Sequence, residues 1–286
     1  MNGIVIIDKP AGWTSQDVVS KLRGVLHTKR IGHGGTLDPM ATGVLPVFVG
    51  RATRGVEFFE HAEKTYEAVL RLGLTTDTED ITGRVLTQNP VNISRDQLEA
   101  ALEDFRGEIR QVPPMYSAIK INGQKLCDLA RRGREVERKP RAVTIFELTA
   151  LDFSGETARL RVRCSKGTYI RTLCKDIGEK LGCGGCMESL RRVAAGEYTV
   201  EEAVELAALV QSSDPESYLR PVDTMFTSYE AVTLTEKQAL RCRNGNSFSI
   251  DLPAGTYRAY GTNGEFLMLA KVDDGVMSTI KSFFEV

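Results

Sequence analysis

Long hydrophobic runs are missing from this 286-residue chain. No stretch of about 18 consecutive apolar residues occurs, so no membrane-spanning helix is expected. The chain begins Met-Asn-Gly-Ile-Val-Ile-Ile-Asp, which has neither the basic region nor the cleavage site of a signal peptide. We therefore expect a cytoplasmic protein.

Cysteine is sparse and lacks the spacing of a disulfide framework. The six cysteines are scattered along the chain, which fits reduced thiols better than paired ones. Cys183-Gly-Gly-Cys186 has the spacing of half a zinc site, but no second pair of cysteines or histidines stands at finger spacing from it. A glycine-rich turn after a helix that ends near Leu181 is the favoured interpretation, and no metal is expected.

Cofactor-binding fingerprints are absent as well. The chain has no Walker loop, no G-x-G-x-x-G dinucleotide fingerprint and no His-Glu-x-x-His motif. No cofactor is therefore expected.

The formal net charge of −1 hides an uneven distribution. Between positions 106 and 141, ten lysines and arginines stand against four aspartates and glutamates, and between 158 and 192 nine stand against three. From 197 to 286 the balance reverses to seven against fourteen. A solvated helix face would explain one basic cluster, whereas two clusters favour contact with phosphate groups and so a nucleic-acid partner.

Apolar periodicity and capping patterns divide the chain into interleaved strands and helices. Helices are expected over about 16–26, 94–105, 169–181, 199–210 and 235–244, and strands over about 3–8, 66–72, 143–153, 158–164, 257–260 and 266–272. Residues 111–141 contain Pro113-Pro114, an Asn122-Gly123 turn and many charges, so a partly mobile hairpin and arm is expected there. Hairpin connections in place of regular βαβ units indicate an α+β fold.

One carboxylate, Asp38, stands in a stretch otherwise made of glycine, small residues and aliphatics. The stretch reads Gly32-His-Gly-Gly-Thr-Leu-Asp-Pro-Met-Ala-Thr-Gly-Val-Leu-Pro46. Pro39 disfavours the α conformation for Asp38, and the glycines allow tight turns and close approach of a ligand. The pattern predicts a rigid, partly desolvated loop that presents one acid, and an ordinary Asp-Pro turn is the alternative.

Five motifs in fixed order resemble those of the TruB family, the bacterial tRNA pseudouridine-55 synthases. The loop around Asp38 is one of them. The others are Gly3-Ile-Val-Ile-Ile-Asp-Lys-Pro-Ala-Gly-Trp-Thr-Ser15, Lys64-Thr-Tyr66 with Thr76-Asp-Thr-Glu-Asp80 and Gly83, Ser165-Lys-Gly-Thr-Tyr-Ile-Arg-Thr-Leu173, and Leu190-Arg-Arg192. Together they cover roughly residues 1–195.

The resemblance implies a mixed, largely antiparallel central sheet with flanking helices, the pseudouridine synthase fold, and an active site in a cleft across it. It implies a catalytic domain over 1–225, with an RNA-binding arm at about 111–141, and a small PUA-like β-barrel over 230–286. The implied reaction converts uridine 55 in the T-loop of tRNA to pseudouridine after base flipping. This isomerisation exchanges no electron and no phosphate, so it requires neither nucleotide nor metal.

The resemblance also implies roles for single residues. Asp38 is the catalytic aspartate, whose carboxylate acts as nucleophile or as base. Arg171 holds this carboxylate in a bidentate pair. The substrate-binding set is His33, Tyr66, Tyr169, Arg171 and Leu190. In this set His33 supports the flipped arrangement by stacking, and Tyr66 stacks on the uracil and takes part in removal of the C5 proton. One departure is Gly34, which stands where many relatives carry threonine and is expected to loosen the loop.

Two other interpretations remain open at this stage. A tRNA-binding folding chaperone without catalytic activity would need the basic clusters but no acid in an apolar loop, so it should tolerate Asp38→Asn. A guide-RNA-dependent relative would share the Thr-Leu-Asp-Pro core, but the continuation Met-Ala-Thr-Gly-Val-Leu-Pro and the lack of long basic tails argue against it. A monomer that acts on the T-arm without guide RNA or obligate protein partner is expected.

Overall fold

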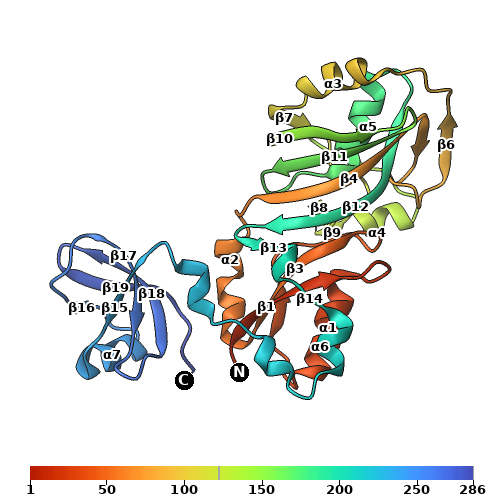
Figure 1. The fold of residues 1–286 in the computed structure, drawn as a ribbon. Helices are drawn as coiled ribbons and strands as arrows, with labels where there is room; N and C mark the ends of the chain where they lie inside the picture. Colours follow the sequence, from red (N-terminus) through yellow and green to blue (C-terminus); the bar gives the residue numbers. More distant parts are fainter. Residues whose placement is uncertain (122, 286) are drawn as a thin grey trace.

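The computed structural model describes residues 1–121 and 123–285, drawn in Figure 1. The helices are α1 (Ser15–Val25), α2 (Val56–Phe59), α3 (Arg95–Glu103), α4 (Leu126–Arg131), α5 (Ile170–Lys180), α6 (Leu206–Gln211) and α7 (Glu236–Arg243). Short 3₁₀ helices are η1 (Gly50–Gly55), η2 (Val200–Glu202), η3 (Pro215–Tyr218) and η4 (Val222–Phe226). Within the described ranges no helix is long and apolar enough to cross a membrane.

Ten strands form one large mixed sheet in the order β14-β1-β3-β12-β4-β11-β10-β7, with β2 beside β3 and β13 beside β12. These strands are β1 (Gly3–Lys9), β2 (Ile31–His33), β3 (Thr42–Val49), β4 (Lys64–Leu72), β7 (Gly107–Gln111), β10 (Arg141–Phe153), β11 (Thr157–Cys164), β12 (Gly185–Ala195), β13 (Tyr198–Thr199) and β14 (Val204–Glu205). The pairs β1–β14 and β3–β12 run parallel, and the other neighbours in this order run antiparallel. The predicted mixed, largely antiparallel sheet is confirmed.

Side-chain alternation places the core on the face of the sheet that α3 and α5 cover. Along β4 every second residue, from Lys64 to Leu72, is buried, and the residues between them are only partly so. The buried side chains of β4, β10, β11 and β12 pack with Leu98 and Leu102 of α3 and with Leu173 and Ile177 of α5. This cluster fixes the position of α5 over the middle of the sheet.

Capping sequences set several helix starts as predicted. Thr14, Ser94 and Thr235 each accept from the backbone of the third residue of the helix, and that residue's side chain accepts in return from the cap. Because these bonds satisfy amides that lack a partner within the helix, α1, α3 and α7 begin where the sequence indicates.

The predicted helix over 199–210 is wrong in its first half. Thr199 and Glu202 do form a capping box, but only the 3₁₀ helix η2 follows it. Ala203 is extended, and Val204 pairs with Ile7 of β1 as strand β14. Hydrogen bonds to the edge of the sheet replace the helical ones there, and a helix begins only at Leu206.

Strands β3 and β12 were not expected from the sequence. The predicted loop over 32–46 ends early because β3 begins at Thr42 and is buried between β1 and β12. The short element predicted at Leu190-Arg-Arg192 belongs to β12, whose alternation is broken by register shifts at Met187/Ser189 and Arg192/Ala194. Such bulges hide a strand from a period-two search.

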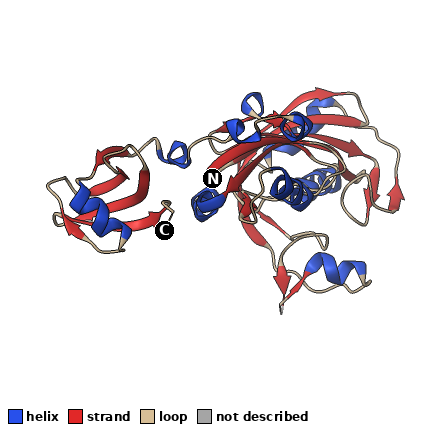
Figure 2. Cartoon of the chain, turned by 90° about the horizontal axis from the view of Figure 1, so that it is seen from below, coloured by secondary structure: helices blue, strands red, loops and turns tan. Residues whose placement is uncertain are grey.

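The arm predicted over about 111–141 contains a two-stranded hairpin followed by α4. Strands β8 (Lys120–Ile121) and β9 (Gln124–Lys125) pair with each other, and the predicted turn residue Asn122 lies outside the described residues. Figure 2 shows the hairpin and α4 projecting from the body of the large sheet. A second small ribbon pairs β5 (Leu74–Thr76) with β6 (Val85–Gln88).

The C-terminal part is a curled five-stranded sheet in the order β15-β17-β18-β19-β16, consistent with a PUA-like half-barrel. Its strands are β15 (Glu230–Thr233), β16 (Phe248–Ser249), β17 (Gly255–Tyr260), β18 (Phe266–Asp273) and β19 (Val276–Ser282). The predicted hairpin of β17 and β18 is confirmed. Phe283 lies 5.7 Å from Phe226, measured between ring centroids, and both pack in one cluster with Phe48 of β3. The two sheets are thus joined by a shared apolar cluster.

Candidate active site

The loop that carries Asp38 is fixed from both sides by the turn between β1 and α1. The hydroxyl of Ser15 accepts from the amide of Leu37 at 2.9 Å. The buried ammonium of Lys9 donates to the carbonyl of Pro39 at 3.2 Å, as well as to two carbonyls of its own turn. Leu37 is buried in the cluster under α5. The loop is therefore anchored at Leu37 and Pro39, on either side of Asp38.

Asp38 and Arg171 form a bidentate ion pair. Nε of Arg171 lies 2.9 Å from Oδ2 of Asp38, and Nη2 donates to Oδ1 at 3.3 Å. The arginine side chain is 6% exposed, whereas that of Asp38 is 34% exposed. The buried guanidinium thus holds the carboxylate in place, while solvent or a substrate can still reach the carboxylate.

A second carboxylate, Asp80, lies on the other side of the same guanidinium. Its Oδ2 is 3.9 Å from Nη1 of Arg171, and its Oδ1 accepts from the hydroxyls of Thr78 and Thr82 at 2.9 and 2.6 Å. Nη1 of Arg171 also donates to the carbonyl of Thr78 at 3.2 Å. Arg171 is therefore held by a polar network that does not depend on Asp38 alone.

Burial raises the pKa of the Asp38 carboxyl above its ordinary value, and the nearby charge of Arg171 opposes that rise. The carboxylate of Asp80 acts in the same direction as burial. Asp38 is consequently a more basic and less solvated carboxylate than a surface aspartate, which suits a nucleophile or a proton acceptor.

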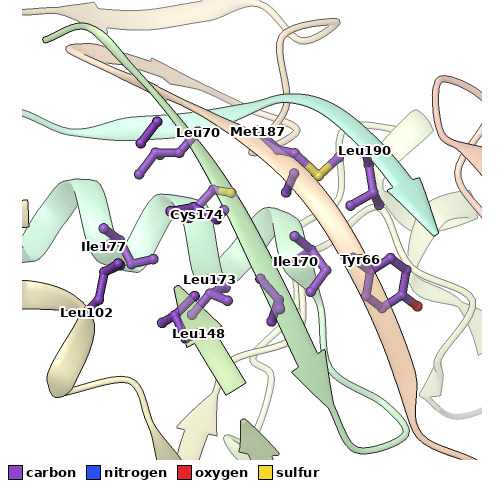
Figure 3. Packing of buried hydrophobic residues seen from close by; sticks show 14 of the residues in the cluster. Tyr66, Leu70, Leu102, Leu148, Ile170, Leu173, Cys174, Ile177, Met187 and Leu190 are labelled. Carbon is purple, nitrogen blue, oxygen red and sulfur yellow. The ribbon is translucent and has the colours of Figure 1, made fainter. Parts of the chain in front are cut away.

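Tyr66 and Leu190 form an apolar floor beside the acid. They extend from neighbouring strands β4 and β12 and belong to the cluster that also contains Leu37 and Ile170. Figure 3 shows Tyr66, Ile170 and Leu190 at one end of this cluster, with the Tyr66 hydroxyl pointing away from it. An aromatic ring and an aliphatic side chain beside a carboxylate can support a planar base.

Tyr169 connects the start of α5 to the root of the arm. Its amide donates to Oε1 of Gln111 at 3.0 Å, and Nε2 of Gln111 donates back to its carbonyl at 3.2 Å. The carbonyl of Tyr116 accepts from Nη2 of Arg171 at 2.8 Å. The position of the arm is therefore coupled to the guanidinium that binds Asp38.

His33 is not joined to the acid. In the described residues no hydrogen bond or ion pair links it to Asp38 or Arg171, and its buried Nδ1 has no hydrogen-bond partner there. Burial lowers the pKa of His33, and the charge of Arg192 adds to this effect. The structure thus brings Asp38, Arg171, Tyr66, Tyr169 and Leu190 together, whereas His33 lies at the end of β2 without a bond to this group.

Gly34 does not loosen the loop, contrary to the expectation from its sequence. It is buried, and its amide donates to the carbonyl of Pro46 at 2.9 Å. A Cβ atom added to Gly34 would lie 2.5 Å from the ring of Phe59 and 2.9 Å from that of Phe48. Two phenylalanine rings fill the space that a threonine side chain would need.

We expect Gly34→Ala to lower the free energy of unfolding by about 1–3 kcal/mol because it overpacks this contact. Denaturant unfolding measures the change. The added substitution Phe59→Leu should recover part of the loss, and a double variant less stable than the sum of the two single changes would contradict this packing argument.

The predicted glycine-rich turn follows α5 over residues 181–184, and Gly185 and Cys186 already belong to β12. Gly182 and Gly184 adopt left-handed backbone conformations, with φ of 77° and 79°, and Cys183 and Cys186 are both buried. Over residues 1–121 and 123–285 no three His, Cys, Asp or Glu side chains converge as metal ligands would.

Sequence reasoning assigned no role to Asp80 or Arg192. Asp80 stood in a quoted motif, but nothing in its spacing indicated that it would face Arg171. Arg192 is 1% exposed, although a neighbouring pair of arginines normally indicates a solvated surface. The glycines of the loop were the available signal that another segment packs closely against it. Gly43 lies so close to the Arg192 backbone that no larger residue fits.

Comparison with known sequences identifies two matching family models. The TruB family pseudouridylate synthase N-terminal domain matches residues 23–170, and the tRNA pseudouridylate synthase B C-terminal domain matches residues 171–227. The tRNA pseudouridine synthase B of Dechloromonas aromatica is 47% identical over 257 residues, covering 89% of this chain and 85% of the relative. That of Stutzerimonas stutzeri is 43% identical over 282 residues, covering 96% and 92%.

Two solved complexes contain a chain with the same fold. A Cbf5-Nop10-Gar1 complex contains a chain with a TM-score of 0.74 and 25% identity, covering 99% of this chain and 85% of that one. An H/ACA ribonucleoprotein bound to a substrate RNA contains one with a TM-score of 0.72 and 23% identity, at the same coverage. These likenesses extend over both sheets.

Proposed function

Because this chain belongs to the TruB family of pseudouridylate synthases, we propose that the Asp38 site isomerises uridine 55 in the T-loop of tRNA to pseudouridine. Its relatives are named tRNA pseudouridine synthase B, and this chain is accordingly an isomerase that acts on tRNA. The observation that carries the finer proposal is the bidentate Asp38–Arg171 pair beside the floor of Tyr66 and Leu190.

The reaction rearranges one nucleotide without a co-reactant. The bond between C1′ and N1 breaks, the uracil turns, and C5 bonds to C1′. The proton on C5 then leaves while its bonding electrons restore the C5–C6 double bond, and N1 ends with a proton. Since atoms and electrons balance within the nucleotide and solvent protons, no co-reactant is needed. The residues of this chain orient the base, exclude water and move protons, and if Asp38 attacks C1′ the bond that it forms breaks again when C5 bonds to C1′.

Asp38 acts next to C1′, either attacking it or taking a proton from the sugar. In both versions the carboxylate must be ionised, and its burial opposes ionisation. The Arg171 guanidinium at 2.9 Å offsets this burial and holds both carboxylate oxygens in one orientation.

The target uridine must leave its stack to reach Asp38, at a cost of a few kcal/mol. We propose that the ring of Tyr66 and the side chain of Leu190 bind the flipped base, that Tyr169 closes the site next to Arg171, and that His33 supports the loop of the RNA. The Tyr66 hydroxyl, which points away from the apolar cluster, is positioned to pass on the C5 proton (Figure 3).

The arm supplies exposed cations for the RNA backbone. Its hairpin and helix expose Lys120, Lys125, Arg131, Arg132 and Arg134, while Leu126 and Leu129 are buried beneath them. Arg171 donates to the carbonyl of Tyr116 in the arm. Closing of the arm on the T-arm of the tRNA would therefore shift the guanidinium that binds Asp38.

The domain division and setting form part of the same proposal. We assign the catalytic domain to 1–225, with its arm at 111–141, and a PUA-like RNA-binding domain to 230–286. The enzyme would act as a monomer in the cytoplasm, without guide RNA and without a cofactor.

Release of tritium from tRNA labelled at C5 of uridine tests the proposal. The wild-type chain should release label from a transcript with uridine at position 55 and none from a transcript with cytidine there. Binding of both transcripts without any release would contradict the enzymatic proposal and favour a tRNA-binding folding chaperone. Release from both transcripts would instead move the reaction to another uridine.

A further inference from the structure

Arg192 is a fully buried cation beneath the catalytic loop. It is 1% exposed, among the largest side chains of the chain that solvent does not reach. Its Nε donates to the carbonyl of Val44 at 2.7 Å, and its Nη2 donates to the carbonyl of Gly35 at 3.1 Å. In the described part of the chain no aspartate or glutamate forms an ion pair with it. Burying a guanidinium that binds only carbonyls costs folding free energy. A role in the function of the protein would explain why the chain keeps this residue.

The strand register sets Arg192 beside the base floor. Arg192 of β12 is the direct cross-strand partner of Tyr66 in β4, and both are buried. Side chains of directly opposed residues on one face of a sheet lie close enough to interact. The side chain of Arg192 therefore lies next to that of Tyr66, and its guanidinium also binds Gly35 of the loop that leads to Asp38.

Two glycines of the loop, Gly35 and Gly43, lie close to this arginine. A Cβ on Gly35 would lie 3.5 Å from Nη1 of Arg192, and Gly35 has a left-handed φ of 110°. Gly43, also left-handed, packs directly on the Arg192 backbone. The loop thus approaches Arg192 at both of its ends, and Asp38 lies between these two contacts.

We propose that Arg192 is a positioning residue for the isomerisation, which acts through Tyr66 and through the carbonyl of Gly35. It fixes the loop ahead of Asp38 and holds a positive charge next to the phenol that handles the C5 proton. It does not touch the substrate. This inference rests on the proposed role of Tyr66.

The electrostatics of Tyr66 agree with this geometry. Burial raises the pKa of the Tyr66 phenol, and the charge of Arg192 opposes the rise. A phenol with an ordinary pKa of about 10 is a weak base. A cation beside it favours the form that has lost its proton, so the phenol can take part in proton removal through water at a lower free-energy cost.

The chain offers a matched control in the adjacent residue. Arg191 points to the opposite face of β12, is 41% exposed and pairs with Asp8 at 2.7 Å. A change to glutamine at either position removes the same charge from the same strand. Arg191 also donates to the hydroxyl of Thr42 at the start of β3 at 3.2 Å. Only the change at 192 reaches Tyr66 and the carbonyl of Gly35.

The test compares single-turnover tritium release by Arg192→Gln, Arg191→Gln, Tyr66→Phe and the Tyr66→Phe/Arg192→Gln double variant. We expect Arg192→Gln to slow release by about 30-fold or more while the Kd for tRNA changes by less than about threefold. In the Tyr66→Phe background the same change should slow release by less than about threefold, because its main target is already gone. Arg191→Gln should match the wild type.

Three outcomes would overturn the inference: Arg192→Gln as fast as Arg191→Gln, a loss confined to the Kd, or an undiminished loss in the Tyr66→Phe background. Arg192→Lys keeps the charge and can reach one of the two carbonyls, so it should release tritium faster than Arg192→Gln. If Arg192→Gln does not fold, an Arg192→Lys rate as low as that of Tyr66→Phe would contradict the role of the charge. No release by the wild-type chain would count against the proposed function instead.

Discussion

Replacing Asp38 with asparagine is expected to reduce pseudouridine formation to below about one thousandth of the wild-type rate, with tRNA binding retained. Asparagine has nearly the same shape and still accepts one hydrogen bond from Arg171. It can neither attack C1′ nor take a proton, so only the chemical step is lost. Single-turnover tritium release with enzyme in excess measures the rate, and filter binding measures the Kd.

The same variant should unfold at an unchanged or higher temperature at pH 7. The pKa of Asp38 is higher in the folded protein than in the unfolded chain. The stabilisation that this gives is complete at pH values below the unfolded-state pKa and is lost as pH rises through the folded-state pKa. At neutral pH the charged form therefore costs stability, and Arg171 keeps Asp80 and the carbonyls of Thr78 and Tyr116 when Asp38 is changed. Retained activity in a folded Asp38→Asn protein would exclude Asp38 as the catalytic acid, and a retained folding effect on tRNA would show that binding is separable.

Replacing Arg171 with alanine is expected to damage activity and stability together. The side chain is 6% exposed and carries contacts to two carboxylates and two carbonyls. Its removal leaves the buried Asp80 and the half-buried Asp38 near each other without the cation between them, which should lower the free energy of unfolding by about 3–5 kcal/mol. Thermal or denaturant unfolding measures this change. Arg171→Ala should lose stability whereas Asp38→Asn should not, because the Arg171 side chain is almost fully buried and that of Asp38 is one-third exposed.

The pH dependence separates the two roles of Arg171. Since its charge holds the pKa of Asp38 down against burial, Arg171→Gln should move the acid limb of the single-turnover rate to higher pH than in the wild type. Arg171→Lys keeps the charge but not the bidentate geometry, so its acid limb should stay near that of the wild type while its rate falls. An acid limb that does not move in Arg171→Gln would mean that Arg171 is structural and does not tune the acid.

The sequence by itself determined much of the local structure and the family, and it singled out Asp38 as the carboxylate that we propose to be catalytic. Capping boxes fixed the starts of α1, α3 and α7, since the bonds that form them join residues three apart. Apolar periodicity indicated strands near β4 and β11. The isolated Asp38 in an apolar, glycine-rich stretch, read with the five motifs, pointed to a family that the comparisons confirm.

Only the tertiary structure decided what lies around that acid. Asp80 faces Arg171, and Arg192 lies under the loop, because strands far apart in the sequence become neighbours: β12 inserts between β3 and β4. The same pairing of remote segments turned 204–205 into an edge strand, where sheet hydrogen bonds outweighed a valid capping box. It also packed Gly34 against Phe59. Local patterns encode interactions within a few residues, whereas burial and charge pairing depend on contacts that the folded chain alone creates.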